Sequence, residues 1–139
     1  MISFLLSVRQ PFRFSLIFLY VAGIAALSLL PPQDLPKVQL FKGADKVIHL
    51  VMYLIFSVLS CWTLKTEDNW YAIWLIIPVT VGWGMLMEYI QLEMRLGRSF
   101  SWSDILANTI GVLIGIIIYL SAMLYHQKKH PLNSTSADD

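Results

Sequence analysis

Apolar side chains fill four long runs of the chain, and polar side chains gather between them. A helix needs about 17–25 mostly apolar residues to cross a hydrocarbon core about 30 Å thick. Four runs meet this length: residues 14–30, 47–64, 70–90 and 105–125. The pattern predicts an all-α integral membrane protein, a bundle of four transmembrane helices with short loops.

The segments outside these runs are expected to have simpler roles. Residues 1–13 form an N-terminal juxtamembrane segment, and residues 14–125 form the membrane domain. The first run is longer than the core of a usual cleavable signal peptide, so we expect a retained helix. Residues 126–139 are polar, end with two aspartates and have no apolar periodicity, which predicts a disordered tail.

Composition agrees with a membrane environment. The chain is 57% hydrophobic and 14% charged, with a mean hydropathy of +0.64, which is too apolar for an ordinary water-soluble domain. Its one cysteine, Cys61, lies inside the second run. A single cysteine excludes an internal disulfide and a cysteine metal cluster.

Polar and small residues recur at helical spacing on one face of each of the last three helices. These faces carry Asp45, His49 and Tyr53 on the second helix, Thr80, Gly84, Glu88 and Gln91 on the third, and Asp104, Asn108, Gly111 and Gly115 on the fourth. The second helix starts, the third ends and the fourth starts on the same side of the membrane, so the polar members should share one depth.

One pocket at that end is therefore expected to collect several polar side chains. Its candidate members are Asp45, His49, Glu88, Gln91, Arg98, Asp104 and Asn108. A charged side chain costs about 2.5–3.5 kcal/mol at the bilayer centre and less near the interface, so such groups rarely face lipid without a role. A divalent metal held by Asp45, His49, Glu88 and Asp104 is chemically feasible, but the spacing alone does not require one.

Each candidate also has a structural interpretation. Asp45 and the pair Ser103-Asp104 are suitable helix N-caps. Glu88 is suited to an ion pair with Arg98. The spacing of Gly111 and Gly115 favours close helix packing.

The positive charges give a weak orientation. With four spans, the two sides of the membrane carry five Lys and Arg residues each. If Lys46 and Arg98 are set aside as site residues, the termini lean towards the cytoplasm, where positive loops tend to stay.

Four sequence blocks then resemble a known family. The blocks are SLLPP at residues 28–32, ADKVIHLVMYLIF at 44–56, EYIQ at 88–91 and GRSFSWSDILANTIGVLIG at 97–115. In this order they resemble the VanZ-like family of small bacterial membrane proteins, named for a protein associated with teicoplanin resistance. Leu96-Gly97 stands where members often have Pro-Gly, which leaves the choice between Arg98 and Arg95 open.

The resemblance implies a bacterial inner or plasma membrane protein whose signature side faces outward. Three hypotheses follow. The first is binding of an anionic lipid or cell-wall precursor, with Lys46 added to the site, and an influence on glycopeptide tolerance. The second is a lipid-directed hydrolase or transferase with His49 or Glu88 as general base, although no nucleophile motif is present. The third is a structural subunit with a membrane partner or a second copy.

The expected partners are membrane lipids and no nucleic acid. We expect no cofactor and no resident metal.

Overall fold

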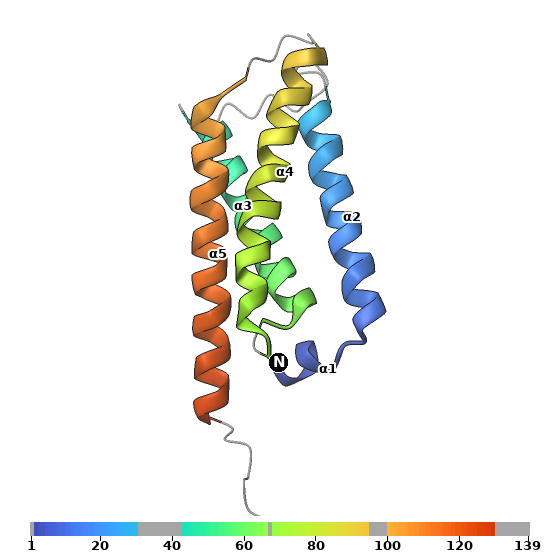
Figure 1. Ribbon diagram of the computed structural model, residues 1–139, viewed down its shortest axis with the longest axis vertical. Coiled ribbons are helices and arrows are strands. Elements are labelled where there is room, and N and C mark those ends of the chain that lie inside the picture. The colour runs from blue at the N-terminus through green and yellow to red at the C-terminus, as the bar shows by residue number, and fades with distance from the viewer. Residues whose placement is uncertain (1, 31–42, 67, 95–99, 130–139) are drawn as a thin grey trace, which may run out of the picture.

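The computed structural model describes residues 2–30, 43–66, 68–94 and 100–129 (Figure 1). All regular elements in these ranges are helical. They are α1 (Ile2–Ser7), α2 (Gln10–Leu29), α3 (Ala44–Leu64), the short 3-10 helix η1 (Trp70–Ala72), α4 (Ile73–Met94) and α5 (Trp102–Lys129). The four long helices are each long and apolar enough to cross a membrane. The predicted four-helix membrane bundle is therefore confirmed.

Several helix boundaries differ from the predicted ones. The juxtamembrane segment contains α1 and the start of α2, where Pro11 occupies the first turn with its backbone angle already suited to a helix. At the other end α5 runs to Lys129, so residues 126–129, assigned above to the tail, are helical. Lys128 and Lys129 lie in that last turn, where positive charge complements the helix dipole. The remaining tail, 130–139, lies outside the described residues.

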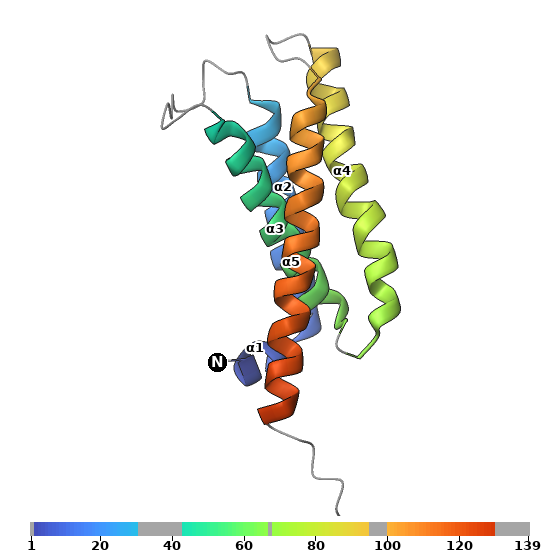
Figure 2. The ribbon, with the colours of Figure 1, turned by 90° about the vertical axis from the view of Figure 1, so that its left-hand side faces the viewer.

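Helices α3 and α5 form the closest pair of the bundle (Figure 2). A Cβ added at Gly111 would overlap the carbonyl oxygen of Leu50, and one added at Gly115 would overlap Leu54 and Ser57. Only glycine lets the α5 backbone lie directly against α3 at these points. This contact fixes the relative depth of the polar residues on the two helices.

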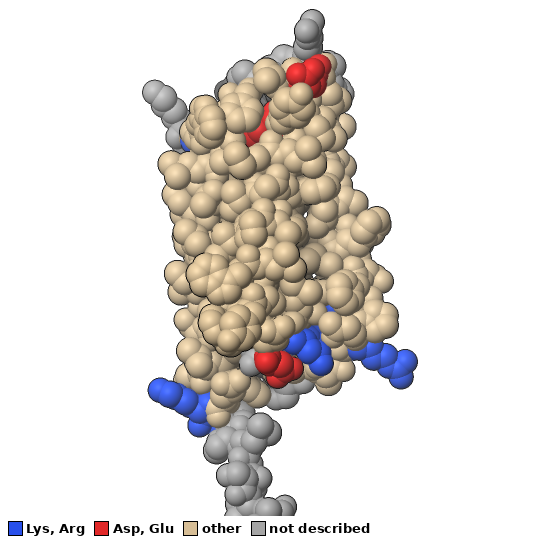
Figure 3. Space-filling view, in the orientation of Figure 1, with Lys and Arg blue, Asp and Glu red and all other residues tan. Residues whose placement is uncertain are grey.

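The faces identified from helical spacing are the faces that point inward. On α4 and α5 the polar members Thr80, Glu88, Gln91, Asp104 and Asn108 are buried. On α3, nearer the helix start, His49 is partly buried and Asp45 is exposed. Below them the core contains aromatic and aliphatic side chains from four helices, among them Ile24, Tyr53, Phe56, Ile76, Val112 and Ile116. The outer faces carry large exposed apolar side chains, and charge is confined to the two ends in the view of Figure 3.

Arg13 closes the end of the bundle where α2 begins and α3 ends. Its side chain is fully buried, with Nη1 donating to the Trp62 carbonyl at 2.7 Å and Nη2 donating to the Leu6 carbonyl at 2.6 Å. Its Nε donates to the Val8 carbonyl at 3.1 Å. Arg13 was counted above as a loop charge, and the structure corrects this, because the guanidinium instead joins α1, α2 and α3.

Candidate functional site

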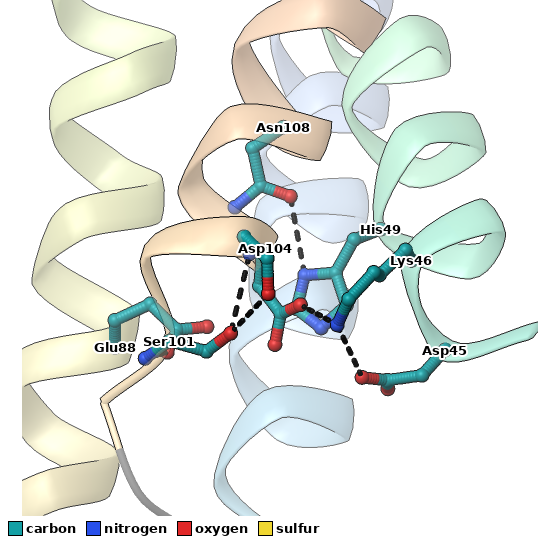
Figure 4. Close-up of polar contacts among 8 residues, drawn as sticks. Asp45, Lys46, His49, Glu88, Ser101, Asp104 and Asn108 are labelled. Carbon is teal, nitrogen blue, oxygen red and sulfur yellow. Dashed lines mark hydrogen bonds and ion pairs between the residues drawn. The ribbon is translucent and has the colours of Figure 1, made fainter. Parts of the chain in front are cut away.

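The predicted polar residues meet at the opposite end of the bundle (Figure 4). Lys46, in the first turn of α3, places Nζ 2.9 Å from Oδ1 of Asp104, in the first turn of α5. Asp45 is more distant, with Oδ2 4.0 Å from the same Nζ. The lysine side chain is 47% exposed and that of Asp104 only 11% exposed. A mostly buried carboxylate therefore holds an ammonium group that still reaches solvent.

His49 is positioned by α5 as well. Its Nδ1 lies 3.1 Å from Oδ1 of Asn108, one turn deeper than the Lys46 pair. An amide oxygen only accepts hydrogen bonds, so this contact requires the proton of the neutral ring on Nδ1. Nε2 then carries the free lone pair. The closest side-chain partners of His49 and Lys46 in the described residues are thus Asn108 and Asp104, and not Asp45.

Glu88 ties the end of α4 to the start of α5. It is 2% exposed, and its Oε2 accepts the Ser101 backbone N–H at 3.0 Å. The Ser101 hydroxyl in turn accepts the Asp104 backbone N–H at 3.3 Å. The Ser101 hydroxyl thus caps α5. In many helices the acid three residues after the cap, here Asp104, accepts the backbone N–H of the cap residue. In this protein Glu88 accepts that N–H instead. The Asp104 carboxylate is left available for Lys46.

The capping hypotheses are corrected by these contacts. Ser101, and not Ser103 or Asp104, precedes α5 as its cap. At α3 the N-cap is Gly43, in the left-handed region with φ 98°, and it makes no side-chain cap bond. Asp45 lies within the first turn, where its charge complements the helix dipole.

Gln91 points away from the other cluster residues. Its Nε2 donates to the Ser28 carbonyl at 2.9 Å, which joins α4 to the last turn of α2. Its amide therefore has a packing partner within the bundle. We define the polar cluster as Asp45, Lys46, His49, Glu88, Asp104 and Asn108, with Gln91 beside it.

The floor of the polar cluster depends on a third glycine. A Cβ at Gly84 would lie 2.9 Å from Nδ2 of Asn108 and 3.2 Å from the Tyr53 ring. Tyr53 itself is 1% exposed, so the face predicted for α3 turns from polar to fully buried within two turns. Gly84 allows α4 to approach the two helices that carry His49 and Asn108.

The arginine of the predicted site lies outside the described residues. Arg95 and Arg98 both fall in 95–99, between the end of α4 and Ser101. The suggested ion pair of Glu88 with Arg98 falls there too.

Three side chains of the polar cluster offer metal-ligand atoms close together. Donor atoms of Asp45, His49 and Asp104 lie within 4.8 Å of one another, whereas Glu88 does not belong to this group. The Lys46 ammonium already lies between the two aspartates and balances part of their charge. Carboxylates and imidazole are suitable donors for a divalent ion, but these contacts do not call for one.

Two residues of this region, Ser101 and Ser28, were not among the predicted site residues. Ser101 forms the pattern Ser-x-x-Asp with Asp104 before an apolar run, which is a recognised capping signal and could have placed the start of α5. Ser28 gave no such signal, because it contributes only a backbone carbonyl.

A scan against protein-family models matches residues 3–125 to the model described as VanZ/LLP1. Searches of curated proteins and of solved structures return no match.

Proposed function

Because this chain belongs to the VanZ/LLP1 family and carries a half-exposed ammonium in a membrane-end polar cluster, we propose that it binds an anionic head group there. The ligand class is a membrane lipid phosphate or a cell-wall precursor, and binding would influence tolerance to teicoplanin-type glycopeptides. The proposed location is the bacterial inner or plasma membrane, with the termini cytoplasmic and the polar cluster on the outer face.

The Lys46 and Asp104 pair is the observation that carries this proposal. A lysine that only needed solvent would extend freely, but here Nζ is held 2.9 Å from a carboxylate of the neighbouring helix while about half of the side chain stays exposed. An ammonium restrained in this way loses less conformational freedom when it binds a phosphate oxygen. Charge-assisted hydrogen bonds of this kind are about twice as strong as neutral ones.

The net charge of the polar cluster suggests which further residues contact the ligand. The described part of the polar cluster has three carboxylates and one ammonium, a formal charge of −2 (−3 + 1) with His49 neutral. Arg95 and Arg98, in the connection before Ser101, would bring the sum to zero. The proposal therefore assigns phosphate contact to Lys46 and one of these arginines, with the carboxylates holding the cations.

A binding experiment tests the proposal directly. Purified protein in nanodiscs of phosphatidylcholine would be titrated with dihexanoyl phosphatidic acid, and binding followed by tryptophan fluorescence. Lys46→Gln should weaken binding about tenfold, as expected for a lost charged contact worth about 1.4 kcal/mol. Asp104→Asn should also weaken binding, though by less than Lys46→Gln, because the ammonium keeps its charge but loses the ion pair that restrains it.

Lys128→Gln is the matched control, since this lysine is exposed at the opposite end of α5. The same variants would be expressed in a susceptible host and tested for growth in teicoplanin. Equal affinity and equal growth for Lys46→Gln and Lys128→Gln, at equal expression, would rule the proposal out.

An enzymatic function is the second candidate, and the His49 contact favours it. Asn108 fixes the proton on Nδ1, so Nε2 is oriented as a general base for a lipid-directed hydrolase or transferase. Glu88 is less suited to this role than predicted, because its carboxylate is buried and accepts the Ser101 N–H. Turnover of a labelled lipid phosphate that is lost in His49→Gln but retained in Glu88→Gln would favour this function over binding.

The third candidate is a structural subunit. Its partner would be another membrane protein or a second copy of this chain. Crosslinking in native membranes would reveal a fixed partner, and polar-cluster substitutions would then lower stability without altering phosphatidic acid binding.

A further inference from the structure

A large apolar groove lies in the half of the bundle away from the polar cluster. Its walls come from the first half of α2, the second half of α3 and the first half of α4, and its volume is about 900 Å³. Wall residues used below are Phe18, Thr63, Leu64, Val79, Thr80 and Trp83. Helices α2 and α4 stand apart at this end (Figure 1), and a crevice between them is visible in Figure 3.

Two walls of the groove, α2 and α3, are tied together where α2 begins and α3 ends. Gln10 Nε2 donates to the Thr63 carbonyl at 2.8 Å, and Arg13 donates to the neighbouring Trp62 carbonyl. These bonds tie the first turn of α2 to the last turn of α3. These contacts do not involve α4, so at this end α2 is held against α3 and the groove lies between α2 and α4.

Two polar atoms of the groove walls have no hydrogen-bond partner in the described part of the chain. They are Oγ1 of Thr63, on a side chain that is 1% exposed, and Nε1 of Trp83. Other groove hydroxyls differ, since that of Thr80 donates to the Ile76 carbonyl at 2.7 Å. A buried polar atom without a partner is costly, so an acceptor beside the Thr63 hydroxyl would be favourable.

Positive charge flanks the same end of the groove. Lys65 follows the wall residue Leu64 and is exposed, and Arg9 is exposed just before α2. Asp68, in the turn after Lys65, is the opposing charge described there. Basic residues at a membrane interface attract anionic lipid head groups.

We propose that the groove binds one acyl chain of an anionic glycerophospholipid from the leaflet on the side of the termini. The ester carbonyl of the lipid accepts a hydrogen bond from Thr63 Oγ1, and its phosphate lies near Lys65 and Arg9. This site is separate from the polar cluster and does not rest on the function proposed for it.

An acyl chain suits the size and the apolar lining of the groove. The groove volume of about 900 Å³ lies within the usual range of about 300–1,000 Å³ for small-molecule sites. Thr63 is also one residue from the end of α3, near the depth at which the ester groups of a lipid lie.

The test is lipid retention measured by native mass spectrometry. Full-length protein would be released from nanodiscs containing equal amounts of phosphatidylglycerol and phosphatidylcholine. Measured in a Lys46→Gln background, so that a lipid at the polar cluster does not add to the count, the chain should retain one phosphatidylglycerol at the groove. Val79→Trp, which fills the groove from α4, should lower the retained fraction about tenfold, whereas Ile117→Trp, on the exposed face of α5, should not.

Two further variants separate the parts of the proposal. Thr63→Val keeps the side-chain shape and removes the hydroxyl, so retention of both lipids should fall. Arg9→Gln combined with Lys65→Gln should abolish the preference for phosphatidylglycerol while a lipid is still retained. Thermal unfolding of each variant checks that it is folded.

Two outcomes would overturn the proposal. One is equal phosphatidylglycerol retention by the folded Lys46→Gln chain alone, with Val79→Trp and with Ile117→Trp. The other is a lipid-free dimer that Val79→Trp dissociates, since the groove would then be an interface between two copies.

Discussion

Arg13 carries a positive charge into the bundle without a carboxylate partner in the described residues. Its partners are backbone carbonyls at the ends of α1 and α3, where the helix dipole concentrates negative partial charge. The guanidinium also lies over the Trp62 ring, with its Cζ 4.8 Å from the ring centroid. A charge so placed is tolerated because most of its donors are satisfied.

Arg13→Met should therefore destabilise the protein strongly. Several buried carbonyls lose their donor, and each unsatisfied group costs about 1–3 kcal/mol, so we expect a loss of at least about 2 kcal/mol. Unfolding by a denaturing detergent would measure it. Arg9→Met is the control, since Arg9 is exposed and makes no side-chain cap bond. Equal stability of the two variants would contradict the role assigned to Arg13.

The Lys46 and Asp104 pair should contribute less to stability, because half of the lysine side chain is in contact with solvent. A double-mutant cycle with Lys46→Gln and Asp104→Asn should give a coupling energy of about 0.5–1 kcal/mol. The coupling should weaken as salt is added. A coupling that is zero at low salt would mean that the ion pair does not order the polar cluster.

At the scale of the elements, the α3 and α5 contact determines where the polar cluster forms. Gly111 and Gly115 bring the two backbones together just below Asn108, so the first turns of both helices end at one level. The His49 and Asn108 contact and the Lys46 and Asp104 pair both bridge these two helices. Separating the helices would break both bridges at once.

Gly111→Ala tests this dependence. The added Cβ would meet backbone atoms of Leu50 and Leu54, which cannot move aside as a flexible side chain can. We expect a loss of about 1–3 kcal/mol, as for other overpacked sites. Gly82→Ala is the control, because nothing lies within 4 Å of its added Cβ, and it should be neutral or stabilising.

Phosphatidic acid affinity should fall together with stability in Gly111→Ala if the polar cluster is the binding site. Full affinity in a folded Gly111→Ala protein would show that binding does not need the α3 and α5 register.

At the scale of the whole molecule, the two ends of the bundle have different tasks. One end holds the polar cluster, and the other holds Arg13 and the apolar groove. With Arg13 set aside as buried, in addition to Lys46 and Arg98, the loop charges are four on the side of the termini and three on the opposite side. The four are Arg9, Lys65, Lys128 and Lys129, and the three are Lys37, Lys42 and Arg95.

The proposed topology predicts the behaviour of fusions after Lys129. A green fluorescent protein fused there should be fluorescent, and an alkaline phosphatase should be inactive, because positive loops favour the cytoplasm. Changing Lys128 and Lys129 to Gln leaves two positive charges against three, so the preferred orientation should reverse. An active phosphatase fusion to the wild-type chain would place the polar cluster on the cytoplasmic side.

The four membrane helices follow from the sequence because their length and apolar content are local properties of each run. The inward faces follow as well, since residues such as Glu88 and Asn108 recur at helical spacing. The existence of one polar end could be predicted from chain direction, which alternates with each crossing.

The partners within that end depended on the tertiary structure. Asp104 and not Asp45 is closest to Lys46, and Gln91 turns to Ser28, because the rotation and depth of each helix are set by packing at Gly84, Gly111 and Gly115. Arg13 could not be distinguished from a loop arginine, since backbone carbonyls of α1 and α3 give no side-chain signal in a sequence. The groove likewise arises from the divergence of α2 and α4, a property that neither helix has alone.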